Sequence, residues 1–312
     1  MSSEPQSHLP GPPRAPRRDF LTALAAGLAT APFATSCASR PSPGGVTKPI
    51  RGSWISIWWD DRRHFYWNDL CLRFTAEQWQ AAVKDVADLG MEYLVLLAIA
   101  KGGKAFYDTP LLPRLETACP DPIEALLAAA DRYRVKFFIS SDWYGEWDAR
   151  ALSDPDRARK RFQMMEEIAR RYSHHPSFYG WYWPNEASLT PYFADAFIAY
   201  QDEVGCLRMG PAESGRAFAT LRQAHDRVPQ RALWADVETF AWEGPPNQQT
   251  SPLIPAPWER VRAQLEAVSP HVNKTLIYQY QGLINRPGTP AFAGHTDSTR
   301  LYTDYVHWLK SR

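Results

Sequence analysis

Apolar runs and amphipathic segments alternate along the chain from about residue 50 onward. The first pair is a predicted strand at 53–58 and a helix after Thr75, where Gln78 three residues later completes a capping-box pattern. Apolar residues at 79, 82, 83, 86 and 89 recur at helical spacing and predict one buried face, and Gly90 marks the end of the helix. The next run, 93–100 (YLVLLAIA), is apolar throughout, as expected for a parallel strand that is covered on both faces.

The same alternation continues to the end of the chain. Helices are predicted after Asp121-Pro122 and Asp154-Pro155, where a capping residue precedes a proline, and again from about Trp258 and Ser298. Further strands are predicted at 135–140, 178–183, 232–237 and 275–280. Alternating strands and helices predict a parallel sheet with crossover helices, and this number of units predicts a (β/α)8 barrel of the TIM type.

One stretch is too short for a complete barrel. Fewer than fifty residues separate Glu186 from Leu233, where an eight-fold barrel requires two further strand–helix units. The one candidate strand there, 197–202 (FIAYQD), could equally continue the preceding helix. We therefore expect an incomplete barrel of seven units in which the fifth strand and its helix are missing, which would leave unpaired strand edges.

The first 37 residues have the pattern of an export signal. The sequence RRDFL at 17–21 has the twin-arginine form, and the small apolar run that follows it to residue 34 is too short to span a membrane. A disordered arm with a chance arginine pair is the alternative. Small residues before Cys37 resemble a lipoprotein cleavage box, although Ala34 stands where a leucine is usual, so either a lipid on Cys37 or simple cleavage is expected. Residues 38–49 then form a linker, and residues 50–312 form the barrel domain, which we expect in the periplasm or anchored to the membrane through that lipid.

Charge and cysteine content exclude several kinds of function. With 35 basic and 34 acidic residues, the chain lacks the electrostatic footprint of a nucleic-acid-binding protein. The number and spacing of Cys71, Cys119 and Cys206 match neither a disulfide framework nor a zinc site. Histidine is scarce, and His174-His175 before a strand is interpreted as a loop, so neither a metal nor a cofactor is expected. The 13 tryptophans and 14 tyrosines suggest flat surfaces for a neutral partner, with core packing as the explanation for about half of them.

Two glutamates stand at strand ends, where a parallel barrel presents its catalytic groups. Glu186 follows the strand at 178–183, and Glu238 ends the one at 232–237. Cleavage of a glycosidic bond requires two such carboxyl groups, one protonated to donate to the leaving oxygen and one ionised to attack or to stabilise the sugar cation. Trp181 and Trp183 would raise the pKa of Glu186, which suits the acid, and Glu238 suits the nucleophile. The alternatives are that Glu186 caps the next helix and that Glu238 pairs with an arginine.

Other polar and aromatic residues follow the same strand ends, and we expect them to bind the sugar. Asn185 can donate a hydrogen bond to a hydroxyl beside the reacting carbon. The remaining members of this set are Trp58, Trp59, Asp142, Trp143, Trp183, Asp236 and Gln279. For each tryptophan the alternative is packing between the barrel and its helices.

Three motifs resemble those of a known family. The sequence WYWPNE at 181–186, QDEVG at 201–205 and WADVETF at 234–240 resemble the bacterial domain-of-unknown-function family DUF4434, which is grouped with glycoside hydrolases. The resemblance runs from about Ile50 to Trp308, and the Asn-Glu pair also resembles the large clan of retaining TIM-barrel glycosidases. The resemblance implies that Glu186 is the acid/base and that Glu238 is the nucleophile. It also implies that Gln201 and Asp202 end the sixth strand and contact the substrate. Here the chain runs directly from the fourth helix into that motif, in agreement with a deleted fifth unit.

The function expected from these features is an exported glycoside hydrolase that cleaves an oligo- or polysaccharide by a two-carboxylate, retaining mechanism without a metal or cofactor. The first alternative is a carbohydrate-binding barrel whose chemistry was lost with the missing segment. The second is a hydrolase of another bond, such as an ester, in which the same carboxylates hold a metal. A pair of carboxyl groups about 5–5.5 Å apart would favour the retaining glycosidase, whereas three or four converging ligands would favour the metal enzyme.

Overall fold

The structure, a computed structural model, describes most of the predicted barrel domain. The described residues are 46–58, 69–141, 155–182, 210–226, 232–244, 253–294 and 296–312. They belong to one compact unit, Val46–Arg312. The export signal, Cys37 and most of the linker lie outside the described residues.

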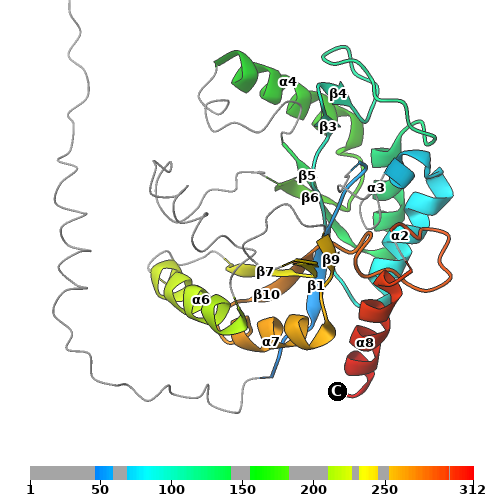
Figure 1. Cartoon of the computed structure of the whole chain (residues 1–312). Coiled ribbons are helices and arrows are strands. Elements are labelled where there is room, and N and C mark those ends of the chain that lie inside the picture. The colour runs from blue at the N-terminus through cyan, green and yellow to red at the C-terminus, as the bar shows by residue number, and fades with distance from the viewer. Residues whose placement is uncertain are drawn as a thin grey trace, which may run out of the picture. The chain divides into compact units, whose positions relative to one another are not determined.

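The unit is an α/β fold built on a parallel sheet of six strands (Figure 1). The strands are β1 (Ile50–Ile55), β2 (Tyr93–Leu96), β5 (Lys136–Ser140), β6 (Phe178–Tyr182), β7 (Trp234–Glu238) and β10 (Lys274–Tyr278). Their order in the sheet is β6–β5–β2–β1–β10–β7, and every neighbouring pair is parallel. The first strand therefore pairs with the last, and β6 and β7 form the two edges of the described sheet.

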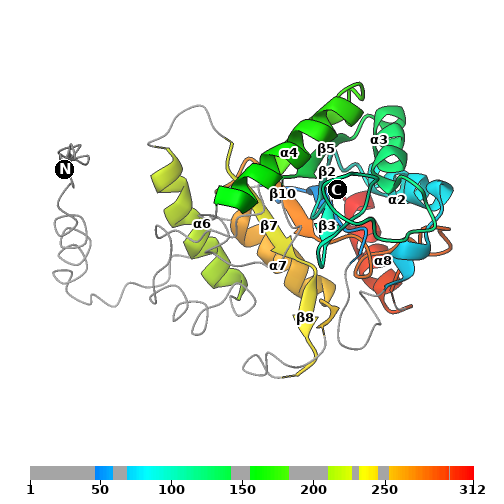
Figure 2. The same cartoon turned by 90° about the horizontal axis from the view of Figure 1, so that it is seen from above.

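In the described part of the chain, six α-helices surround this sheet, and in both views α6 lies beside α7 (Figures 1 and 2). Their bounds are α2 (Ala76–Asp88), α3 (Pro122–Tyr133), α4 (Pro155–Tyr172), α6 (Pro211–His225), α7 (Trp258–Val268) and α8 (Ser298–Lys310). The capping box predicted at the start of α2 is confirmed, because Gln78 N donates to Thr75 Oγ1 at 3.4 Å and Thr75 N donates to Gln78 Oε1 at 3.0 Å. Helix α6 was not among the predicted helices. None of the described helices is both long and apolar enough to cross a membrane.

Aromatic rings from distant strands meet, which shows that the sheet is strongly curved. Phe138 on β5 and Trp234 on β7 are separated by three intervening strands, or about 19 Å along a flat sheet. Their ring centroids are nevertheless 6.2 Å apart, and the ring of Tyr93 on β2 lies 4.7 Å from that of Trp234. These rings and that of Tyr179 fill the concave side of the sheet near the start of its strands. The alternate strand residues face outward, where Leu94, Phe137, Val237 and Ile277 join the main core with the helices.

The structure corrects the boundaries of two predicted strands. The strand predicted at 53–58 is β1, which spans Ile50–Ile55. The apolar run at 93–100 is not continuous, because β2 ends at Leu96 and a hairpin of β3 (Ala100–Lys101) and β4 (Lys104–Ala105) follows. Gly102 and Gly103, which form its turn, have positive φ values of 57° and 73°, a conformation that glycine adopts at low cost. A second antiparallel pair, β8 (Phe240–Trp242) and β9 (Leu253–Pro255), follows the carboxyl end of β7 and was also not predicted.

Candidate active site

Glu238 is the last residue of β7 and lies at the carboxyl end of the sheet. It stands directly opposite Tyr278, the last residue of β10, in the parallel register of these two strands. Only 15% of its side chain is exposed. The sequence-based prediction that Glu238 ends a strand of a parallel sheet is therefore confirmed.

The carboxylate of Glu238 is held by the neighbouring helix α7. Arg260 Nη2 donates to Glu238 Oε2 at 2.7 Å, and Nη1 of the same guanidinium donates to the Phe240 carbonyl at 2.6 Å. Gln264, one turn further along α7 and buried, also contributes a side-chain hydrogen bond to Glu238. This is the pairing with an arginine that the sequence left open as the structural alternative to catalysis.

Burial dominates the acidity of Glu238. Removal of the carboxylate from water raises its pKa from 4.5 to about 7, and the Arg260 charge and the hydrogen bonds from Arg260 and Gln264 lower it only in part. A carboxyl group with a pKa near 7 is present in both protonation states at neutral pH. Strongly raised values of this kind concentrate at functional sites, although structural ion pairs produce them as well.

Three half-buried aromatic rings meet across the curved sheet, and one of them, Tyr278, stands opposite Glu238 in the strand register. The Trp54 ring on β1 lies 5.8 Å from that of Tyr182, the last residue of β6, in an edge-to-face arrangement, and 6.5 Å from that of Tyr278. We refer to Trp54, Tyr182 and Tyr278 as the aromatic floor. No sequence pattern predicted this floor, because only the curvature of the sheet brings β1 against β6. Such rings offer the flat apolar faces on which sugars pack.

Gln279 lies directly beyond β10 and is only 1% exposed. Its Oε1 accepts a hydrogen bond from Ser56 Oγ at 3.0 Å. The neighbouring Gln281 forms two bonds with the Ser56 backbone, since its Oε1 accepts from Ser56 N at 2.7 Å and its Nε2 donates to Ser56 O at 3.1 Å. These bonds continue the pairing of β1 with β10 beyond the ends of both strands, so Gln279 and Gln281 hold the loops that follow.

Trp58 and Asp236 are the other two described members of the predicted sugar-binding set. Trp58 is partly buried and packs against the main core, and Lys101 Nζ lies 4.6 Å from the centre of its ring. Its indole Nε1 is buried and has no hydrogen-bond partner among the described residues. Asp236 is exposed on β7, two residues before Glu238.

The remaining predicted site residues lie outside the described residues. They are Glu186, Asn185, Trp59, Asp142, Trp143, Trp183, Gln201 and Asp202. The separation of the Glu186 and Glu238 carboxyl groups therefore stays a prediction. Trp181, expected to lie beside Glu186, packs against the outer core with Phe178, at a ring distance of 5.2 Å.

A family model for a domain of unknown function, DUF4434, matches the chain over residues 50–199 and 194–291. None of the curated proteins matches it. Among solved structures, a proposed α-L-fucosidase from Bacteroides thetaiotaomicron VPI-5482 is similar with a TM-score of 0.63 and 15% identity, over 89% of this chain and 97% of that one. The GH99 endo-α-mannosidase from Bacteroides thetaiotaomicron is similar with a TM-score of 0.48 and 10% identity, over 83% of this chain and 96% of that one.

At this level of identity, the likeness to the proposed fucosidase shows a shared fold. The match to the family model covers most of the unit that the structure describes, and it agrees with the resemblance that three sequence motifs indicated. The chain therefore belongs to the domain-of-unknown-function family DUF4434.

Proposed function

We propose that this protein is an exported glycoside hydrolase that cleaves an oligo- or polysaccharide with two carboxylates and retains the configuration at the reacting carbon. The observation that carries the proposal is the position of Glu238. A buried carboxyl group with a pKa raised to about 7 ends a strand of the parallel sheet, opposite Tyr278 of the aromatic floor in the strand register. A shared fold with a proposed α-L-fucosidase supports the same class of enzyme.

In this mechanism Glu238 attacks the sugar, and Glu186 first donates a proton to the leaving oxygen and then activates a water molecule. Arg260 keeps part of the Glu238 population ionised, because its charge opposes the effect of burial on the pKa. The aromatic floor supplies an apolar surface for a sugar ring. A retaining reaction requires the two carboxyl groups to lie about 5–5.5 Å apart.

The second candidate is a carbohydrate-binding protein without catalysis, and two observations favour it. Glu238 is held by Arg260 and Gln264, as a purely structural carboxylate would be. The family model also matches in two segments that overlap at residues 194–199, within the stretch where the sequence predicts a missing strand–helix unit. An incomplete barrel would keep the aromatic surface and lose the alignment of the two glutamates.

Nitrophenyl glycosides, α-L-fucosides among them, test both candidates, because a good leaving group needs little protonation. Glu238→Gln should lose turnover on every substrate, since it removes the group that forms the covalent intermediate. Glu186→Gln should keep the first step on nitrophenyl substrates, and azide should partly restore turnover to Glu186→Ala. Glu259→Gln, at an exposed glutamate on α7, is the control and should retain full activity.

Equal losses for both variants on activated and unactivated substrates, without azide rescue, would contradict the assigned roles. A wild-type protein that binds polysaccharides and cleaves none of them would instead support the binding protein.

A further inference from the structure

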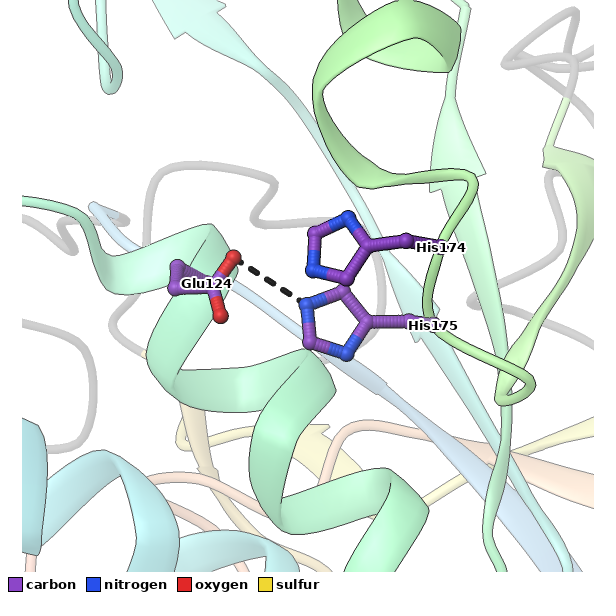
Figure 3. Close-up of side chains that lie close together, drawn as sticks. All are labelled: Glu124, His174 and His175. Carbon is purple, nitrogen blue, oxygen red and sulfur yellow. Dashed lines mark hydrogen bonds and ion pairs between the residues drawn. The ribbon is translucent and has the colours of Figure 1, made fainter.

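Two histidines and a glutamate converge at a position away from the candidate active site (Figure 3). Glu124 lies in the first turn of α3, and His174 and His175 lie in the turn between α4 and β6. One ligand atom from each residue lies within 4.8 Å of those of the other two. The turn immediately precedes β6 and so lies at the amino end of that strand, whereas Glu238 lies at the carboxyl end of β7.

His175 is fixed in the orientation that a metal ligand requires. Its Nδ1 lies 2.6 Å from Asp131 Oδ2, and the other oxygen of Asp131 accepts a hydrogen bond from Ser177 N at 2.8 Å. With its proton on Nδ1 and donated to Asp131, the ring directs the lone pair of Nε2 toward Glu124. A histidine whose second nitrogen donates to a carboxylate is the usual supporting arrangement around a protein-bound metal.

The gap between His175 Nε2 and Glu124 Oε2 must hold either a proton or a metal ion. His175 Nε2 and Glu124 Oε2 are 3.1 Å apart, and both atoms are acceptors in this tautomer. Either a proton on Nε2 or a metal ion must lie between them. With bond lengths of about 2.0–2.2 Å, the two atoms 3.1 Å apart would subtend roughly 90–100° at a metal, which four- and five-coordinate Zn2+ sites accept.

His174 supplies the third ligand. It is exposed, and its ring centroid lies 4.1 Å from that of His175. The side chains of His174 and Glu124 are free enough to close the remaining separation, since Glu124 is 44% exposed. The backbone around them is held in place, because Asp121 caps α3 through Glu124 N at 3.0 Å and accepts hydrogen bonds from Tyr172 Oη at 2.9 and 3.0 Å.

We propose that Glu124, His174 and His175 bind one divalent transition-metal ion, with Zn2+ as the best match, and that Asp131 is the positioning residue for His175. Two imidazoles and a carboxylate are a donor set that Zn2+ favours, with water completing the coordination. The ion would connect the start of α3 to the turn before β6. It would therefore stabilise the folded protein by mass action and take no part in the proposed sugar chemistry.

This site is tested by titrating the full chain, after removal of bound metal, with ZnCl2 and measuring the heat of binding by calorimetry. We expect one Zn2+ per chain at saturation and a rise in the melting temperature that depends on the Zn2+ concentration. His174→Ala should weaken binding by about tenfold or more and remove the thermal shift, and His174 is exposed enough for the fold to tolerate the change. Asp131→Asn should weaken binding about 10- to 100-fold, as loss of a carboxylate that supports a ligating histidine does.

His307→Ala provides the matched control, because His307 is an exposed histidine on α8, remote in sequence from the cluster. It should leave the affinity and the thermal shift unchanged. Binding that survives His174→Ala, or that falls equally with His307→Ala, would place the metal elsewhere and overturn the proposal. The absence of saturable Zn2+ binding in the wild type would also overturn it, and would assign the charge between His175 and Glu124 to a proton.

Discussion

Arg260 and Glu238 form an ion pair that joins the first turn of α7 to the carboxyl end of β7, with 2.7 Å between Nη2 and Oε2. Arg260 also binds the Phe240 carbonyl, so one guanidinium holds both the carboxylate and the chain that follows it. The acidity of Glu238 therefore results from two opposed effects. Burial raises its pKa, and Arg260 lowers it.

The first prediction concerns the pH dependence of catalysis. If Glu238 is the nucleophile it must be ionised, so kcat/KM should rise as the pH rises through about 7. Arg260→Gln removes the charge that lowers the pKa of Glu238, so the acid limb of this profile should move to higher pH. The exposed-site variant Glu259→Gln should leave the limb in place. A limb that falls as the pH rises through 7, and that moves to higher pH with Arg260→Gln, would assign Glu238 the role of the proton donor.

The second prediction concerns stability. The folded protein binds a proton on Glu238 more tightly than the unfolded chain does, because the pKa is raised from 4.5 to about 7. The contribution of Glu238 to the free energy of unfolding should therefore fall by about 3 kcal/mol as the pH rises from about 4 to 8. Glu238→Gln should lose this pH-dependent contribution to the free energy of unfolding. The variant should therefore gain stability relative to the wild type at the higher pH.

Urea unfolding of the wild type and the variant at both ends of that range measures this difference. The contributions of the other titrating groups are the same in both proteins, so they cancel in the comparison. The free energy of unfolding of Glu259→Gln should change with pH as that of the wild type does. A stability difference between the wild type and Glu238→Gln that is the same at both pH values would contradict the prediction.

The third prediction concerns the packing of β1 against β2. A Cβ atom at Gly52 would lie 2.7 Å from the Tyr93 carbonyl oxygen and 2.8 Å from Tyr93 Cβ, so the two strands would have to separate. Gly52→Ala should destabilise the protein by about 2 kcal/mol or more, as overpacking of a core does. At Gly180 the nearest atom, in the Phe138 ring, is 3.5 Å away, so Gly180→Ala should have little effect. Equal unfolding midpoints for the two variants in thermal melts would refute this account.

The fourth prediction concerns export. Replacement of both Arg17 and Arg18 by lysine should leave the protein in the cytoplasm if the twin-arginine motif directs its transport. Cell fractionation and immunoblotting measure the distribution. Secretion of the double-lysine variant at the wild-type level would show that the arginine pair is a chance feature of the N-terminal arm.

Features that depend on residues close together in the chain could be predicted from the sequence alone. The start of α2 followed from Thr75 and Gln78, and the start of α3 from Asp121-Pro122, because a helix cap is formed by groups within four residues of each other. The alternation of apolar strands and amphipathic helices predicted the parallel sheet. It also placed Glu238 at a strand end. The hairpin after β2 was missed, because an apolar run does not reveal where a strand stops pairing.

Contacts between side chains far apart in the chain follow from the folded structure and could not be predicted from the sequence. Arg260 lies 22 residues beyond Glu238, and Glu124 lies 51 residues before His175, so no local pattern connects either pair. The aromatic floor depends on the curvature that brings β6 against β1, and the buried environment that raises the pKa of Glu238 depends on the docking of α7. Contacts of this kind arise when helices pack against a curved sheet, and the free energy that selects them belongs to the assembled core rather than to any one segment.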